Sequence, residues 1–425
     1  MKLKTIFTAL ITIISLAFCT AVIRAQVTAI KAGKLVIPET GTTATNQVIL
    51  IEGEKIKAIG ANLPIPEGAN VIDLSNATVL PGLFDAHTHL CSNMEYQWDS
   101  GDYLVHSLNW RTGMRAIIGV KNAKEMLEAG FTTVRDVGNA GDYADADLAK
   151  AIGWNMVPGP TMIVAGRIIA PFGGQFVKPV PKQVLDNPEY LFADSRDELR
   201  KGIRENIYYG AKVIKLVVDG YSRGYMYSAE DIKFVVDEAG RAGLKVAAHA
   251  VTKQGARNAA EAGAASIEHG WILDQEEFDL MKKNNVALVS TDFTIKSLQA
   301  GGYSGDGARA NHAKKVERLK RAYQAGVTIV FGTDVMAGLK GETRGTLAIG
   351  YIDSFVEAGV PNTDILRALT TSAARLLGVE KGRGMLAPGM YADIIAVPEN
   401  PLDNIQTLKQ VSFVMKNGKV YKPNK

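Results

Sequence analysis

The chain has little of several features that define protein classes. Its 425 residues include two cysteines, six histidines and a net charge of +4. So few cysteines exclude a disulfide-stapled scaffold, and no zinc-finger spacing is present. The small net charge, without a basic stripe, gives no reason to expect a nucleic-acid partner. A composition of 47% apolar and 22% charged residues is instead typical of a soluble globular protein with an ample core.

A long apolar run occurs at the N-terminus. Lys2 and Lys4 precede apolar residues from about position 6 to 18, and smaller and polar residues follow. This layout predicts a signal peptide over residues 1–25, cleaved after Ala25 or, as a second choice, after Ala21. The run is too short for a convincing membrane span, so an N-terminal anchor is the weaker alternative. We therefore expect a secreted or periplasmic protein without stable membrane insertion after cleavage.

The two cysteines bear on this interpretation. A lipoprotein would need a small residue before Cys19, and Phe18 stands there. Loss of the signal peptide removes Cys19 and leaves Cys91 alone, so no intrachain disulfide can form. Because no separate base or orienting group for Cys91 can be identified, we interpret it as a small buried apolar side chain rather than a nucleophile.

The order of strand-like and helix-like segments predicts two units. Residues 26–80 and 380–425 both read as short strands broken by turn residues, and we expect them to combine into one small β-sandwich. Between them, residues 81–379 alternate apolar β-rich runs with amphipathic helical stretches, the pattern of a (β/α)8 TIM barrel. The eight candidate strands end near His89, Asp136, Ala165, Leu216, His249, His269, Ser290 and Asp334.

The segment LPGLFDAHTH carries the first candidate metal ligands. Side chains two residues apart in a strand share a face, so His87 and His89 point to one side. An HxH motif alone is weak evidence for a site. Its position at the end of the first barrel strand places both rings at the active-site mouth and favours a functional role.

Lys215 interrupts the apolar run KVIKLVV of the fourth strand. A buried lysine is costly unless its charge is removed or paired. Beside metal cations its neutral amine can take up carbon dioxide, and the resulting carbamate has two oxygens that can bridge two metals. An ion pair with an acidic neighbour in the barrel is the alternative, but it leaves the histidines unexplained.

Three further strands end in ligand residues. His249 ends KVAAH and His269 lies in SIEHG, and each offers a nitrogen suited to zinc. Asp334 closes VTIVFGTD with a carboxylate that can bind metal and handle protons. The set divides into His87, His89 and Asp334 around one metal and His249 and His269 around the other, with Lys215 between them.

These motifs, in this order, resemble the amidohydrolase superfamily. LPGLFDAHTHL, the strand-four lysine, KVAAHAVT, SIEHG, FGTD and the tail GMLAPGMYADIIAV carry the resemblance over almost the whole mature chain. The sequence is most similar to the imidazolonepropionase-like branch, which includes metal-dependent prolidases, dipeptidases and ochratoxinase-like amidases. The resemblance implies two zinc ions, or other divalent metals, bridged by carboxylated Lys215. It also implies a homo-oligomer.

Two positions depart from the prolidase-like pattern. Many of those relatives have a tyrosine two residues after the strand-five histidine, where this chain has Val251. Many also carry a GGHG loop after strand three, where this chain reads FGGQF at residues 172–176. Both departures argue against a strict preference for C-terminal proline.

The predicted reaction is hydrolysis of a small-molecule amide, a dipeptide (Xaa-Pro or another C-terminal residue) or an N-acyl amino acid. A hydroxide bridging the metals is expected to attack the carbonyl, and Asp334 to carry its proton to the leaving nitrogen. Tyr221, Tyr225 or Tyr227 is expected to contact the carbonyl oxygen, and Arg223 a substrate carboxylate.

Two other functions compete with this one. The first is a cyclic amide hydrolase or a deaminase of the same fold. Deaminase-like relatives commonly lack the lysine that stands here at Lys215 and carry a glutamate shortly after the histidine that stands here at His249. Neither holds for this chain. A non-catalytic secreted binding protein would have lost metal ligands, and all six are present. Of the remaining polar residues, Arg135 and Asp136 are expected to form a structural ion pair, His106 to lie on a helix face, and His312 in a loop or at a helix start.

Overall fold

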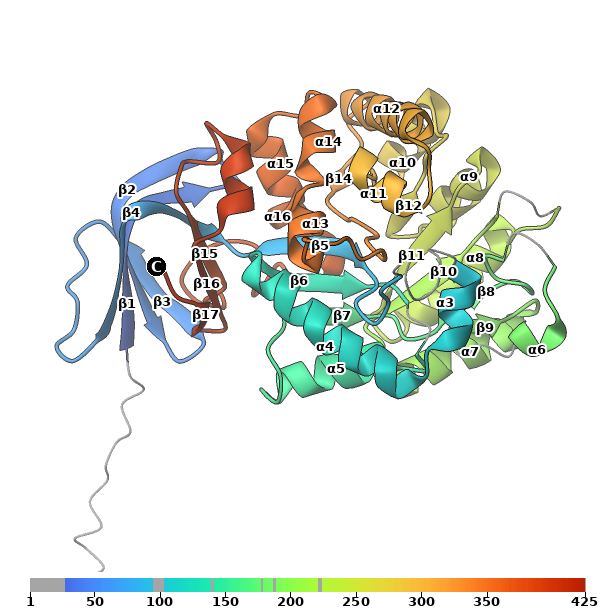
Figure 1. The fold of residues 1–425 in the computed structure, drawn as a ribbon, viewed down its shortest axis with the longest axis horizontal. Helices are drawn as coiled ribbons and strands as arrows, with labels where there is room; N and C mark the ends of the chain where they lie inside the picture. Colours follow the sequence, from blue (N-terminus) through green and yellow to red (C-terminus); the bar gives the residue numbers. More distant parts are fainter. Residues whose placement is uncertain are drawn as a thin grey trace, which may run out of the picture.

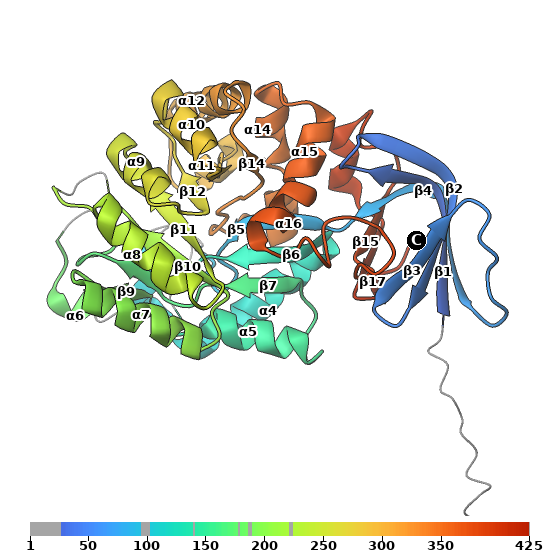
Figure 2. The same cartoon turned by 180° about the vertical axis from the view of Figure 1, so that it is seen from behind.

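The computed structural model describes residues 27–94, 103–138, 141–176, 179–185, 189–220 and 224–424. The predicted signal peptide lies outside these residues. The chain folds into a small β unit and a larger unit in which helices surround parallel strands, as both views show (Figures 1 and 2). Strands from the two ends of the chain, blue and red in the figures, lie together in the small unit.

The small unit is one seven-stranded sheet rather than two separate sheets. The long strand β4 lies between its halves, since residues 70–74 and 78–79 pair with β1 on one side and residues 78–81 pair with β15 on the other. The order is β17-β16-β15-β4-β1-β2-β3. The strands are β1 (Val27–Ile37), β2 (Thr42–Glu52), β3 (Lys55–Gly60), β4 (Asn70–Pro81), β15 (Ile394–Val397), β16 (Phe413–Lys416) and β17 (Lys419–Lys422).

This sheet curls around its own core. At the outer edge of β3, the Ile56 amide donates to the Met390 carbonyl at 2.9 Å, and the Ala392 amide donates to Glu54 at 2.8 Å. These bonds join β3 to the segment that leads into β15, so the sheet returns on itself. Apolar residues of both chain ends, such as Ile30 and Ile394, are buried in one cluster inside.

Parallel strands form the centre of the larger unit. The strands are β5 (Leu83–Thr88), β6 (Phe131–Asp136), β7 (Thr161–Val164), β8 (Ile168–Ala170), β10 (Val213–Val217), β11 (Lys245–Ala250), β12 (Ser266–His269), β13 (Ala287–Val289) and β14 (Ile329–Val330). Here β7 and β8 are successive parts of the third barrel strand, because β7 pairs with β6 and β8 pairs with β10. A further short strand, β9 (Tyr190–Phe192), pairs with β8.

Hydrogen bonds between β5 and the segment directly after β14 close the ring of eight strands. The Ala86 amide donates to the Phe331 carbonyl at 2.9 Å, and the Asp334 amide donates to the His87 carbonyl at 2.8 Å. The predicted (β/α)8 barrel is therefore confirmed. Because all strands are parallel, the residues at their C-terminal ends meet at one mouth.

Helices cover the outside of the barrel (Figure 2). Several begin with a side-chain cap, for example the capping box of Ser195 and Glu198. The helices are α3 (Tyr103–Asn109), α4 (Thr112–Glu128), α5 (Ala144–Gly153), α6 (Lys182–Leu185), α7 (Arg196–Tyr208), α8 (Ala229–Gly240), α9 (Lys253–Glu261), α10 (Gln275–Lys283), α11 (Ile295–Ala300), α12 (Gly305–Gln324), α13 (Arg344–Ile349), α14 (Ile352–Glu357), α15 (Asn362–Ala368) and α16 (Thr371–Leu377), with the 3-10 helix η1 (Ile405–Gln410). Within the described ranges, none of these helices has the length and apolar character needed to cross a bilayer.

Candidate metal centre

The six predicted metal ligands line one cavity of about 210 Å³ at the C-terminal ends of the barrel strands. Five other residues complete the described wall. The lining is His87, His89, Ile168, Gln175, Glu189, Lys215, His249, His269, Trp271, Asp334 and Met336. Residues as much as 247 positions apart in the chain thus converge because parallel strands end at the same mouth.

Hydrogen bonds fix the two β5 histidines with one ring nitrogen toward the cavity. Nδ1 of His87 lies 2.6 Å from a Glu268 carboxylate oxygen, and Nδ1 of His89 lies 2.6 Å from the Gly138 carbonyl. Both acceptors favour a proton on Nδ1, which leaves Nε2 as the free lone pair. Nε2 of His87 is buried and has no hydrogen-bond partner among the described residues. A metal ion would satisfy that nitrogen.

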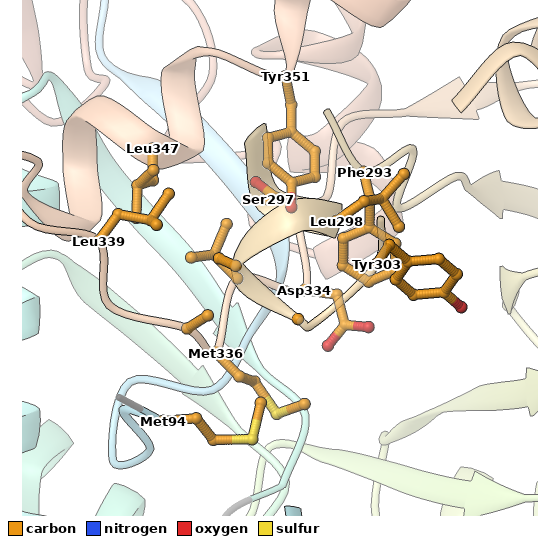
Figure 3. Close-up of a pocket in the computed structure, with 14 residues that line it drawn as sticks. Met94, Phe293, Ser297, Leu298, Tyr303, Asp334, Met336, Leu339, Leu347 and Tyr351 are labelled. Carbon is orange, nitrogen blue, oxygen red and sulfur yellow. The ribbon is translucent and has the colours of Figure 1, made fainter. Parts of the chain in front are cut away.

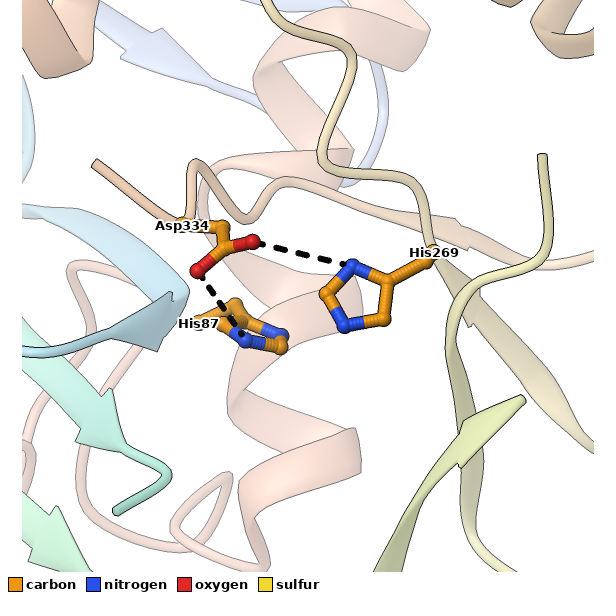
Figure 4. A group of neighbouring side chains, drawn as sticks. All are labelled: His87, His269 and Asp334. Atoms are coloured by element: carbon orange, nitrogen blue, oxygen red, sulfur yellow. Dashed lines mark ion pairs between the residues drawn. The ribbon is translucent and has the colours of Figure 1, made fainter. Parts of the chain in front are cut away.

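Asp334 lies among three of the imidazole rings. Its Oδ1 is 3.2 Å from Nε2 of His89. The same oxygen is 3.7 Å from Nε2 of His87, and Oδ2 is 3.7 Å from Nδ1 of His269 (Figure 4). One ligand atom each of His87, His269 and Asp334 lies within 4.8 Å of the others. Burial lowers the pKa of His87 and of His269, so both rings are neutral, as a metal requires.

Backbone strain accompanies two of these residues. His269 has φ of 72° and Asp334 has φ of 57°, in the left-handed region that side chains other than glycine rarely adopt. Such conformations cost about 1–3 kcal/mol each and cluster at functional sites. The two strained residues are a ligand at the end of β12 and a ligand shortly after β14, and both side chains line the cavity.

Lys215 lies in the middle of β10 and is 2% exposed. Burial lowers its pKa to about 8, although Glu268 and Asp334 act in the opposite direction. None of the described carboxylates forms an ion pair with it, so the structure gives no support to the simple ion-pair interpretation. A lysine that loses its proton this readily is suited to carbamate formation.

A buried acidic residue that sequence reasoning missed supports the centre from behind. Glu268 is fully buried, accepts from His87 and accepts from Nη2 of Arg135 at 2.7 Å. The predicted ion pair between Arg135 and Asp136 is wrong, because Arg135 reaches across the barrel to Glu268. Asp136 instead accepts from the Leu90 amide at 2.7 Å. The sequence signal that could have identified Glu268 is a glutamate within the apolar, strand-like run SIEH.

Asp85 links the first and last barrel strands behind the same histidine. Its carboxylate accepts from the amides of His87 and Thr333 at 3.0 and 3.1 Å and from the Thr333 hydroxyl at 2.7 Å. Gly332 completes this contact, since a Cβ there would lie 2.3 Å from a Val289 methyl and 2.9 Å from Cβ of His87. The close packing leaves His87 little freedom to move.

The FGGQF loop reaches the cavity. Nε2 of Gln175 lies 3.3 Å from Nδ1 of His249, and Oε1 of Gln175 accepts from the Tyr190 hydroxyl at 3.0 Å. Gln175, one of the two residues that distinguish this loop from GGHG, therefore contacts a ligand histidine. Val251, the other departure, is buried and donates its amide to Asp219 at 2.8 Å, outside the cavity lining.

The residues predicted to bind substrate are placed differently. Tyr221 and Arg223 lie outside the described residues. The Tyr225 hydroxyl donates to the Phe172 carbonyl at 2.5 Å, and the Tyr227 hydroxyl donates to the Ala193 carbonyl at 2.5 Å. Neither tyrosine belongs to the cavity lining described here.

The other two histidines and the cysteine stand apart from the centre. His106 is buried in α3, and its carbonyl accepts from Arg115. His312 lies inside α12 rather than in a loop or at a helix start, because the helix already begins at the Ser304 cap. Cys91 is a buried free thiol whose pKa is raised by burial, as expected for an inert side chain.

One cavity at the mouth of the parallel barrel is surrounded by four histidines, a lysine and an aspartate. This arrangement defines a barrel enzyme with a candidate metal site. A sequence model of the amidohydrolase family matches residues 78–421 of the chain. Ochratoxinase from Aspergillus niger is 30% identical, over 94% of this chain and 87% of its own length. Imidazolonepropionase from Paracoccus denitrificans is 25% identical, over 81% of this chain and 86% of its own.

Solved structures agree with these relatives. A Xaa-Pro dipeptidase crystallised with methionine in its active site superimposes with a TM-score of 0.80 and 29% identity, over 93% of this chain and all of that one. The chain therefore belongs to the amidohydrolase family, and it is a hydrolase acting on amide C–N bonds. The resemblance to the imidazolonepropionase-like branch is confirmed.

Proposed function

We propose that this protein is a secreted, metal-dependent amidase with two zinc ions, or other divalent metals, bridged by carboxylated Lys215. Its substrates are dipeptides or N-acyl amino acids. The observation that carries the proposal is the convergence of six ligand-type residues on one cavity, with the buried Nε2 of His87 unsatisfied. A metal ion bound at the cavity would satisfy that nitrogen.

The chain offers two sets of donors. His87, His89 and Asp334 would hold one ion, and His249 and His269 the other, with Lys215 between them. Glu268 and Gly138 orient the two β5 rings. Bound divalent ions would supply a water of lowered pKa and polarise the substrate carbonyl.

Asp334 is placed to move the proton. Its carboxylate faces the cavity beside His87, His89 and His269, within reach of any water held there. We propose that it accepts the proton of the attacking water and delivers it to the amide nitrogen as the C–N bond breaks.

The substrate class rests on the named relatives. Ochratoxinase and a Xaa-Pro dipeptidase share 29–30% identity with this chain over nearly its whole length. Gln175 and Val251 stand where the prolidase-like pattern has other residues, so we propose acceptance of C-terminal residues besides proline.

Activity on a library tests the proposal. Zinc-loaded protein should hydrolyse at least one member of a panel of dipeptides and N-acyl amino acids. Asp334→Asn should lower kcat by about 10²- to 10⁴-fold while keeping most of the metal. An inactive wild-type protein, or a fully active Asp334→Asn variant, would contradict the proposal.

Secretion has its own test. The mature protein recovered from the medium or the periplasm should begin after Ala25, or at the second site after Ala21. An intact N-terminus on a membrane-bound protein would contradict it.

A further inference from the structure

A buried lysine lies behind one wall of the metal cavity. Trp271 forms part of this wall, and its ring centre is 4.9 Å from that of the His269 imidazole. The ammonium of Lys315 lies 3.4 Å from the ring centre of the same indole. Lys315 belongs to α12 and is not itself part of the cavity lining. A cation, an indole and a predicted metal ligand are therefore in contact, one after the other.

Ring contacts, and not a hydrogen bond, orient Trp271. An indole has a single N–H donor, and a buried tryptophan usually finds a partner for it. Nε1 of Trp271 is buried without a hydrogen-bond partner among the described residues. Its ring contacts are with His269, with Lys315 and with Phe293, one of the side chains drawn in Figure 3, whose ring centre lies 5.8 Å away. Lys315 is the charged member of this set, so it can supply the strongest directional attraction.

The surroundings of Lys315 direct its ammonium to aromatic faces. The residue is 5% exposed, and the acidic residue that acts on it most strongly, Asp292, forms its ion pair with Arg318. Burial lowers the pKa of Lys315 to about 7, whereas Asp292 and the rings of Trp271 and Phe293 favour the charged form. The attraction between a cation and an aromatic ring is strongest where water is excluded, as it is here.

His269 needs support because its surroundings are strained. Both His269 and Thr291 have positive φ, and the Thr291 hydroxyl lies 2.9 Å from Nδ1 of His269. A β-branched residue such as Thr291 rarely adopts a φ of 46°. Conformations of this kind persist only where the surrounding structure holds them. Thr291 holds one edge of the imidazole, and Trp271 packs against the same ring, so a loosened indole would give His269 more freedom.

We infer that Lys315 is a positioning residue of the metal centre: its ammonium holds the Trp271 indole, and the indole keeps the His269 imidazole in its metal-binding orientation. The inference goes beyond the proposed function, and it rests on that function only in taking His269 as a metal ligand. Because Lys315 acts through Trp271, replacing the lysine should have no effect on metal binding once the indole is gone.

Fluorescence of the metal-free protein tests the contact between Lys315 and Trp271. The chain has four tryptophans, so each protein is compared with the same protein carrying Trp271→Phe, and the difference is the emission of Trp271. Acrylamide should quench this emission about twofold more effectively in Lys315→Met than in wild type, because the indole is released. Lys315→Arg keeps a cation and should resemble wild type. Lys314→Met, at an exposed position next to it on α12, is the matched control.

Zinc titration tests the contact between Trp271 and His269. Lys315→Met and Trp271→Leu should each weaken the binding of one zinc ion by about fivefold, less than the loss of a direct hydrogen-bond partner of a ligand. Lys315→Arg and Lys314→Met should bind zinc as wild type does. In the double variant Lys315→Met/Trp271→Leu, the loss should equal that of Trp271→Leu alone, since the lysine acts through the indole. Unfolding in urea checks that each variant is folded.

The two measurements separate the inference from the proposed function. Equal quenching in wild type and Lys315→Met would overturn the inference, and so would a further loss of zinc affinity when Lys315→Met is added to Trp271→Leu. Two zinc ions bound with wild-type affinity by Lys315→Met would leave the proposed function intact and contradict the positioning role. A wild-type protein that binds no zinc but shows the quenching difference would contradict the proposed function, while the hold of Lys315 on Trp271 would stand.

Discussion

Replacing Glu268 with glutamine tests how the barrel holds His87 in its metal-binding orientation. Glu268 accepts from Nδ1 of His87 at 2.6 Å with one oxygen and from Arg135 at 2.7 Å with the other. Glutamine has one carbonyl oxygen and cannot serve both donors. If that oxygen faces Arg135, the NH2 group faces His87 and forces the proton onto Nε2, the nitrogen that points into the cavity.

The size of the effect follows from burial. His87, Glu268 and Arg135 are all at most 2% exposed, so water cannot replace a lost acceptor. Loss of such an outer-shell partner typically costs 10- to 100-fold in metal affinity. A buried donor left unsatisfied costs about 1–3 kcal/mol of unfolding free energy. We expect Glu268→Gln to show both losses.

The assay is titration of zinc into metal-free protein, with unfolding in urea measured in parallel. Glu261→Gln, an exposed position on α9, makes the same change of charge and should leave affinity and stability unchanged. If Glu268→Gln is folded and binds zinc as tightly as wild type, the orientation of His87 does not depend on Glu268, and this reasoning is refuted.

Two further predictions concern packing and pH. Gly332→Ala should lower kcat although the protein is still expressed, because the new Cβ would lie 2.9 Å from Cβ of His87 and 2.3 Å from Val289. A variant with wild-type activity and normal metal content would contradict this, since it would show that the strand ends can shift freely. Lys416 of β16 donates to the Gly159 carbonyl at 2.8 Å, and burial lowers its pKa from 10.5 to about 8. Between these pH values the unfolded chain binds more protons than the folded one, so the contribution of Lys416 raises the free energy of unfolding with pH, by about 3 kcal/mol in total. Urea unfolding at several pH values should show that rise in wild type and its loss in Lys416→Met, and identical pH profiles would contradict it.

The sequence predicted the barrel and its mouth well because parallel strands impose simple rules. Each ligand residue follows or interrupts an apolar β-rich run, and the C-terminal ends of such strands meet at one mouth. Lys215 could be singled out because a lysine inside a buried strand needs an explanation. These inferences used local pattern and barrel geometry alone.

Contacts across the barrel could not be predicted in the same way. Arg135 pairs with Glu268, 133 residues away, rather than with its neighbour Asp136, because adjacent residues of a strand point to opposite sides. The Tyr227 hydroxyl turns to the Ala193 carbonyl, a partner that no local pattern indicates. A second cavity, of about 150 Å³, which shares Asp334 and Met336 with the metal centre, likewise depends on how the β13 and β14 loops pack against α11.

Zinc titration of metal-free wild-type protein, with amide hydrolysis followed at each step, tests the central claim most directly. Activity should rise with added zinc and reach its plateau at two ions per chain, and Lys215→Ala should bind fewer ions tightly unless a short-chain carboxylic acid is added. Full activity without metal, or no zinc bound at this site, would contradict the account.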